Sequence, residues 1–342
     1  MTNDEIRMTM TKDEAAMVVN RRNWILLGLV WLLLFRSLGA AQEGKAGVKD
    51  EIFTVVLLPD TQFYSEKYPE TYVAQTMWIR ERVKTDNIKF VVCLGDIVQN
   101  AHVEQEWVRA DQAAHILDGV VPYSAVPGNH DTVTKDKVLT RNSELYNKYF
   151  GVQRFAKEPW YGGHWGETND NNFCTFSVAG RQFLVLSLEY GPRDEALAWA
   201  EEVCRKHPDH NIIVATHSYL NLKGRITTPI KVAESTSNNG EEMWQKFVRK
   251  QPNVFMVACG HVGGVLQQVS ANDSGAPVVE ILTDYQNLAE GGQGWLRTMK
   301  FVPAENKIYV EAYSPLLKQH NADPKHTHTI DLDFSRLRMT RS

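Results

Sequence analysis

Five short polar clusters, each directly after a short apolar run, constrain the fold of this chain more than any other feature. The clusters are Asp60-Thr61-Gln62, Gly95-Asp96, Gly128-Asn129-His130-Asp131, Thr216-His217 and Gly260-His261-Val262-Gly263. The apolar runs before them are Ile52–Pro59, Phe90–Leu94, Val121–Pro127, Ile212–Ala215 and Val254–Cys259. Strands of an α/β sheet present their carboxyl ends to one crevice, so we expect these side chains to meet there. Their carboxylates, amide and imidazoles are a ligand mix that suits a hydrolytic metal site.

The order of the predicted elements indicates the fold class. Helical patterns at 70–84, 104–117, 194–206 and 241–249 alternate with the apolar runs, and residues 173–178 and 182–188 are typical of a β-hairpin. After the last polar cluster the helices stop, and four strands are predicted at 265–269, 278–282, 296–302 and 307–313. The sequence therefore predicts an α/β fold with mixed β-sheets packed as a sandwich and flanked by helices. One domain is expected over 51–342, with a β-rich C-terminal part.

The first fifty residues predict export. Arg21 and Arg22 precede the apolar run 24–35, whose twelve residues fit a signal-peptide core and fall short of the roughly 20 that span a bilayer. We interpret 1–41 as a signal peptide or an uncleaved N-terminal anchor, and 42–50 as a linker. The expected location is therefore periplasmic or secreted, with membrane contact only through residues 24–35 if the segment stays uncleaved.

Charge and cysteine content narrow the function classes. The formal net charge of −4, with no block of like charges, argues against a nucleic-acid binder. Of the four cysteines, Cys93 and Cys259 lie inside apolar runs, which favours buried thiols over disulfides. The cysteines have no CxxC spacing, so a cysteine zinc site is not expected.

The clusters themselves indicate a division of roles. Two carboxylates held close together, Asp60 and Asp96, repel each other unless a cation neutralises them. The amide oxygen of Asn129 is a potential metal ligand, and the adjacent His130 is placed to act on a substrate. Asp131 is expected to orient the His130 ring by accepting its other N–H. Taken singly, each residue has a structural interpretation, such as a turn cap or a packed histidine; together they predict a catalytic site.

In their order, these motifs resemble the calcineurin-like metallophosphoesterase superfamily. The family pattern is Asp-x-His, Gly-Asp-x-x-Asp/Asn, Gly-Asn-His-Asp/Glu, a lone His and Gly-His-x-His, and the resemblance extends over residues 52–269. It implies two divalent metal ions bridged by Asp96. Asp60 would bind the first ion, and Asn129, His217 and His261 the second. It further implies that a metal-bound hydroxide hydrolyses the phosphoester bond, with His130 as general acid or transition-state stabiliser.

Two departures from the family pattern affect the first metal position. Gln62 stands where the family has a metal-binding His, and Gly263 stands in place of the last His. An amide oxygen at Gln62 remains available as a ligand, whereas Gly263 offers only its backbone. The expected ions are Mn²⁺, Fe²⁺ or Zn²⁺, with Mg²⁺ as a further candidate, and the oxygen-rich first position favours Mn²⁺, Fe²⁺ or Mg²⁺ over Zn²⁺. Asn100, His102 and His164 are candidate replacement ligands.

The resulting hypothesis is an exported, metal-dependent phosphoesterase that acts on a small-molecule phosphoester. One alternative is a phosphodiesterase or nucleotide pyrophosphatase on the same fold, and another is a degenerate, non-catalytic binding protein. A metal hydrolase that acts on carbon centres fits the Gly-Asn-His-Asp motif poorly. The non-periodic segments 160–172 and 283–295 are predicted to form walls of the substrate pocket, although no single substrate-binding residue is identified.

Overall fold

The computed structural model describes residues 51–233 and 235–340, and these residues belong to one compact unit. The predicted leader and linker, 1–41 and 42–50, lie outside the described residues. Within the described residues, no helix is long and apolar enough to cross a membrane.

Two seven-stranded mixed sheets form the centre of the part of the chain that the structure describes. The first sheet runs in the order β17-β16-β15-β1-β2-β3, with β18 also paired to β16. Its strands are β1 (Phe53–Leu58), β2 (Ile88–Cys93), β3 (Tyr123–Ala125), β15 (Leu296–Val302), β16 (Lys307–Ser314), β17 (Gln319–His320) and β18 (His328–Asp331). Strands β1, β2 and β3 are parallel, so their carboxyl ends lie at the same edge.

The second sheet runs in the order β13-β14-β12-β9-β8-β7-β6. Its strands are β6 (Tyr161–His164), β7 (Asn172–Val178), β8 (Arg181–Leu188), β9 (His210–Thr216), β12 (Val254–Cys259), β13 (Gly264–Ala271) and β14 (Pro277–Asp284). Strands β8, β9, β12 and β14 are parallel, and β13 is antiparallel to β14. Two short hairpins, β4 (Thr134–Lys135) with β5 (Val138–Leu139) and β10 (Leu220–Asn221) with β11 (Gly224–Arg225), lie outside both sheets.

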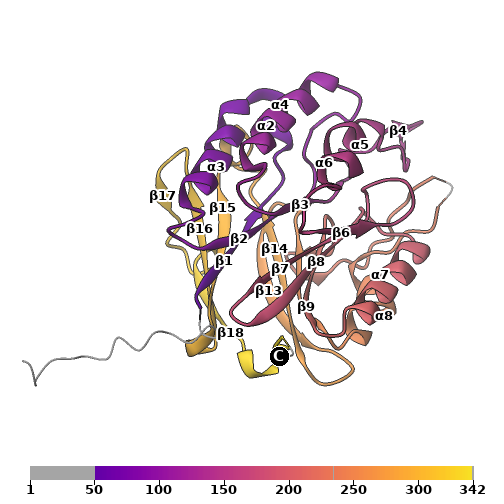
Figure 1. Cartoon of the computed structure of the whole chain (residues 1–342). Helices are drawn as coiled ribbons and strands as arrows, with labels where there is room; N and C mark the ends of the chain where they lie inside the picture. The colour runs from indigo at the N-terminus through magenta and orange to yellow at the C-terminus, as the bar shows by residue number, and fades with distance from the viewer. Residues whose placement is uncertain (1–50, 234, 341–342) are drawn as a thin grey trace, which may run out of the picture. The chain divides into compact units, whose positions relative to one another are not determined.

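Helices cover the outer faces of the two sheets (Figure 1). The helices are α2 (Gln62–Lys67), α3 (Pro69–Arg82), α4 (Glu104–Ala114), α5 (Glu144–Phe150), α6 (Val152–Phe155), α7 (Asp194–Lys206), α8 (Gly240–Lys246) and α9 (Ala289–Gly292). Side chains of α3 and α4 pack on the first sheet, and side chains of α7 and α8 pack on the second. The predicted helix Asp194–Lys206 and the predicted hairpin, now β7 and β8, are confirmed.

Strand alternation explains how three apolar layers form. Phe53, Val55 and Leu57 of β1 face the core between the sheets, while Val56 and Leu58 face the helices. Because both faces of such a strand are buried, its sequence is a continuous apolar run rather than an alternating one. The predicted sandwich of mixed sheets flanked by helices is therefore confirmed. The four cysteines are free and buried, as predicted.

Candidate metal centre

Asp60 and Gln62 follow β1, the central parallel strand of the first sheet. Asp60 is almost completely buried, and its Oδ1 accepts the backbone N–H of His261 at 3.0 Å. This bond joins the end of β1 to the end of β12 in the other sheet. Gly260 makes the approach possible, since a Cβ there would lie 2.2 Å from Oδ2 of Asp60. Gln62 is the first residue of α2, and its Nε2 donates to Oε1 of Gln99 at 2.8 Å.

Asp96 lies in the turn after β2 with a left-handed backbone, φ +46°. Its Oδ1 accepts the backbone N–H of His130 at 2.9 Å, and its Oδ2 lies 3.2 Å from Nε2 of His217. Asp96 therefore contacts both the Gly128–Asp131 loop and the second sheet. A non-glycine residue with positive φ is strained, and His261 has the same feature with φ +75°. Such strain clusters at functional sites, where the surrounding structure enforces it.

The Gly128–Asp131 loop follows β3 and holds the predicted catalytic pair in a different way from the one expected. Nδ1 of His130 lies 2.8 Å from the carbonyl oxygen of Gln99 rather than against Asp131. Asp131 instead accepts the backbone N–H groups of Ile97, Val98 and Gly128 at 2.8–3.1 Å. The prediction that Asp131 orients the His130 ring is therefore wrong. A buried carboxylate satisfies unpaired turn amides, so Asp131 shapes the loop, whereas a backbone carbonyl orients His130.

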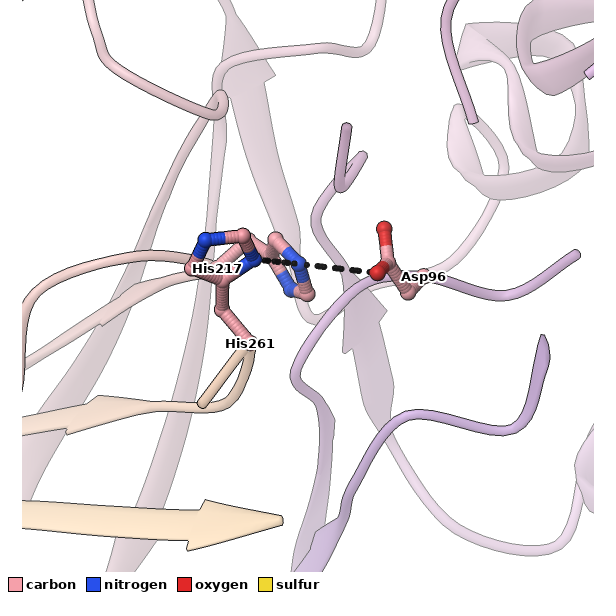
Figure 2. A group of neighbouring side chains, drawn as sticks. All are labelled: Asp96, His217 and His261. Carbon is pink, nitrogen blue, oxygen red and sulfur yellow. Dashed lines mark hydrogen bonds and ion pairs between the residues drawn. The ribbon is translucent and has the colours of Figure 1, made fainter. Parts of the chain in front are cut away.

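His217 and His261 meet between the two sheets. His217 directly follows β9 and is fully buried, and its Nδ1 lies 2.8 Å from the carbonyl oxygen of Leu94. Nδ1 therefore carries the hydrogen, which leaves Nε2 directed at Oδ2 of Asp96 and at Nδ1 of His261, 3.2 Å away. Figure 2 shows the three side chains converging, and their ligand atoms lie within 4.8 Å of one another.

Burial and neighbouring charges have opposite effects on several pKa values in this cluster. Burial alone would lower the pKa of His217, but the charges of Asp96 and Asp60 raise that pKa to about 10. Burial would likewise raise the pKa of Asp96, yet the charge of His217 outweighs it and lowers that pKa. Burial and the His217 charge lower the pKa of His261 to about 4. The cluster thus places one protonated imidazole where carboxylate and imidazole ligand atoms converge, which is also where a cation would be stabilised.

Two buried amide oxygens test whether the site suits metal ions. Oδ1 of Asn129 and Oε1 of Gln62 are buried and have no hydrogen-bond partner among the described residues. A buried acceptor without a partner is costly, typically about 1–3 kcal/mol, unless an ion or water satisfies it. Both oxygens belong to the predicted ligand set, which also includes Asp60, Asp96, His217 and His261. The donor set therefore fits divalent metal ions.

The three candidate replacement ligands do not join this cluster. Nδ2 of Asn100 donates to Oε1 of Glu106 at 2.8 Å. His102 is exposed in the loop before α4. His164 lies on β6, an edge strand separated from β9 by β7 and β8.

Asp284 is a buried acid near the site that the motif analysis missed. It is the last residue of β14 and is completely buried. Burial raises the pKa of Asp284 to about 6. After burial itself, the charge of Asp284 is the largest influence that raises the pKa of Asp60. A signal was present in the sequence, because Asp284 follows the predicted strand 278–282 as the other acids follow theirs. It fell instead within segment 283–295, which was interpreted as a pocket wall.

A groove lies near the histidine side of the cluster. Its lining includes Lys135, Arg141, Trp165 and Arg193. Arg141 donates to the carbonyl oxygen of Tyr190 at 2.7 Å, and the Tyr190 ring centroid lies 5.4 Å from that of His261. Segment 160–172 thus contributes Trp165 to this groove, whereas Trp295, at the end of 283–295, is buried.

Comparison with known families places these motifs in context. The model of the family described as calcineurin-like phosphoesterase matches residues 53–264, which include every motif described above except Asp284. The chain is 36% identical over 287 residues to the uncharacterized protein YvnB of Bacillus subtilis (strain 168). That match covers 80% of this chain and 21% of YvnB, so the chain spans about a fifth of the length of that relative.

Solved structures similar to this chain include two proteins from a plant and a parasite. A purple acid phosphatase, PPD1, from yellow lupin (Lupinus luteus) seeds superposes with a TM-score of 0.52 at 12% identity, over 84% of this chain and 55% of that one. GAP50 of Plasmodium, described as the anchor in the inner membrane complex, gives a TM-score of 0.43 at 11% identity, over 84% and 95% of the two chains. The likeness to the lupin protein supports the fold.

Proposed function

This chain belongs to the calcineurin-like phosphoesterase family, and we propose that its site hydrolyses a small-molecule phosphoester with the help of two divalent metal ions. One observation carries the proposal: among the described residues, the buried oxygens of Asn129 and Gln62 have no hydrogen-bond partner, and the ligand atoms of Asp96, His217 and His261 lie within 4.8 Å of one another. A scaffold without metal would gain nothing from two unsatisfied buried acceptors.

The ligands divide between two positions. Asn129, His217 and His261 would hold one ion, Asp60 and Gln62 the other, and Asp96 would contact both. When bound, divalent ions would neutralise the phosphoryl oxygens and lower the pKa of the attacking water. The fixed Nδ1–H of His217 presents Nε2 as the ligand atom, because the carbonyl of Leu94 accepts the other nitrogen's hydrogen.

His130 is proposed to protonate the leaving group. Its Nδ1 donates to the carbonyl oxygen of Gln99, so Nε2 is the nitrogen that can hold and release a proton. The ring is half-buried, and its backbone N–H is fixed to Asp96 at 2.9 Å. Proton transfer to a leaving alkoxide from such a positioned imidazole contributes about 10²–10⁴-fold to the rate. Asp131 maintains the loop that holds His130 in place.

The substrate is proposed to lie with its organic part toward the groove that contains Arg141, Trp165 and Arg193. A guanidinium stacks on an indole there, with Cζ of Arg193 4.6 Å from the centroid of the Trp165 ring. Export of the chain is also part of this proposal. It rests on Arg21, Arg22 and the apolar run 24–35, which lie outside the described residues.

An activity panel tests the proposal. The full chain is assayed with Mn²⁺ against para-nitrophenyl phosphate, its bis-ester and a set of nucleotides, beside His130→Ala and Asp96→Asn. Metal-dependent hydrolysis by the wild type and its loss in both variants is the expected result. Cleavage of the bis-ester alone would identify a phosphodiesterase. Equal trace activity in all three proteins would instead support a non-catalytic binding protein.

A further inference from the structure

The end of β14 brings a third buried aspartate to the metal centre. Asp284 pairs in register with Gly264 of β13, and β14 also runs parallel to β12, which ends just before His261. Gln286 ties this strand end to the histidine motif, since its Nε2 donates both to Oδ2 of Asp284 at 2.8 Å and to the carbonyl oxygen of His261 at 3.1 Å. Asp284 is thus fixed beside the Gly260–Gly263 motif by β-sheet register and by a side-chain bridge.

The charge around Asp284 is not balanced by basic side chains. Asp60, Asp96 and Asp284 are all at least 98% buried. Within 51–233 and 235–340, the ion pairs of these three acids are those of Asp60 and Asp96 with His217, and neither lysine nor arginine takes part. When they are ionised, these buried carboxylates repel one another. Buried like charges need a counter-charge of their own, and one imidazolium does not neutralise three carboxylates.

Gln62 supplies an independent indication of a ligand. The residue is 97% buried, and its Nε2 is satisfied by Gln99 while its Oε1 has no partner among the described residues. Gln62 begins α2, two residues after Asp60, so both residues follow the end of β1. Position 263 is a glycine and contributes no side chain here; the space that its Cβ would occupy lies 2.0 Å from Nδ2 of Asn287.

We propose that Asp284 is a ligand of the first metal position, together with Asp60, Asp96 and Gln62. The inference rests on the metal-dependent function proposed above and adds a residue from beyond the family match. With Asp284 included, the ligands of this position are three carboxylates and one amide, all of them oxygen donors. Such a site selects Mn²⁺ or Mg²⁺, whereas the position built on His217 and His261 suits Zn²⁺, Mn²⁺ or Fe²⁺.

Mn²⁺ binding to the full chain tests the assignment without substrate. The metal-free wild type, Asp284→Asn and Asp273→Asn are titrated with Mn²⁺ by calorimetry, and the bound ions are followed by electron paramagnetic resonance. Asp273 is an exposed aspartate paired with Arg249, so its variant is a matched control for the chemical change. We expect two Mn²⁺ per chain in the wild type and the control. In Asp284→Asn, one Mn²⁺ should bind unchanged and the other at least about tenfold more weakly, with loss of the spin-coupled signal.

Asparagine keeps an acceptor oxygen for one of the two Gln286 donors and removes like-charge repulsion, so Asp284→Asn is expected to fold, which circular dichroism verifies. If Asp284→Asn does not fold, Mn²⁺ binding to Asp284→Ser is measured by the same titration. Two Mn²⁺ of wild-type affinity in the variant, or only one Mn²⁺ in the wild type, would overturn the assignment. Hydrolysis is measured separately. A wild type that binds two Mn²⁺, loses one on substitution of Asp284 and cleaves no phosphoester would disprove the proposed function and leave the assignment standing.

Discussion

The two sides of the metal centre are built from different chemistry. The side formed by the ends of β9 and β12 offers imidazoles, His217 and His261, whose rings are fixed by a backbone carbonyl and by each other. The side formed by the ends of β1 and β14 offers the oxygens of Asp60, Gln62 and Asp284. The two carboxylates repel each other, and the Gln62 oxygen has no hydrogen-bond partner among the described residues. The imidazole side can balance its charge by protonation, whereas the oxygen side needs a cation. The oxygen side should therefore depend more strongly on metal than the imidazole side.

Substitution of Asp96, which touches both sides, should have the largest effect. Asp96→Asn removes the charge that His217 faces at 3.2 Å and weakens both ion positions at once. Loss of about 4 kcal/mol of transition-state stabilisation corresponds to a fall of about 10³-fold in kcat/KM. Steady-state assays with Mn²⁺ measure it, with Asp273→Asn as the control. Loss of activity against only one class of substrate would show that the two sides act separately rather than through Asp96.

His130 should matter for chemistry but not for metal content, because its Nδ1 faces the Gln99 carbonyl rather than the ligand cluster. His130→Ala is expected to lower kcat by about 10²–10³-fold while both Mn²⁺ ions bind as in the wild type. The exposed His102 provides the control His102→Ala, which should leave kcat unchanged. Should His130→Ala release a metal ion, His130 would belong to the imidazole side as a ligand and not to the leaving-group chemistry.

The sequence predicts some residues of the two sides and not others. The apolar runs before Asp60, Asp96, His217 and His261 predict the strand ends, because strands buried on both faces read as continuous apolar runs. Those residues were therefore identified from the sequence. Asp284 was not, although it too follows an apolar run, because its segment is rich in glycine and resembles a loop. The pairing of β14 with β12 and β13 places Asp284 beside the Gly260–Gly263 motif.

The role of Asp131 shows a second limit. A carboxylate directly after a histidine suggests an orienting pair, and the chain order alone does not say which amides the turn leaves unpaired. In the structure, three backbone N–H groups from two different loops converge on Asp131. Burial raises the pKa of Asp131 to about 7, although these amide donors favour its charged form. Such convergence depends on turn dihedral angles, including the positive φ of Asp96, which no spacing rule specifies.

The stability of the metal-free protein should fall as the pH rises. Asp284 on the oxygen side and His217 on the imidazole side should contribute to this fall in different pH ranges. Asp284 has a folded-state pKa raised to about 6 from 3.8, so the folded state binds the proton more tightly than the unfolded chain. Its stabilising effect is present below about pH 4 and is lost as pH rises through 6. His217, raised to about 10 from 6.5, stabilises below pH 6.5 and loses that effect as pH rises towards 10.

Thermal unfolding of the chelator-treated protein between pH 4 and 10 measures both ranges. Asp284→Asn should reduce the decline near pH 4–6 by up to about 3 kcal/mol and leave the decline above pH 6.5, while the raised pKa values of Asp60 and Asp131 keep part of the decline at acid pH. His217→Asn should reduce the decline above pH 6.5 and leave the decline near pH 4–6. Addition of Mn²⁺ should flatten both declines, since the ion replaces the protons. A single decline that both variants remove together would mean that the two sides titrate as one unit.

The smallest effect concerns the space at position 263, in the loop between β12 and β13. A Cβ in Gly263→Ala would lie 2.0 Å from Nδ2 of Asn287, the tip of an exposed and flexible side chain, so we expect destabilisation of only about 1 kcal/mol. The double variant Gly263→Ala/Asn287→Ala removes the clash and should recover the wild-type free energy of unfolding in urea, while Asn287→Ala alone should be neutral. Mn²⁺ affinity should stay unchanged in all three, because oxygens of Asp60, Gln62, Asp96 and Asp284 would form the proposed first position. If Asn287→Ala alone weakened one Mn²⁺, the oxygen side would include the Asn287 amide, and the glycine would then serve to admit a ligand rather than a packing neighbour.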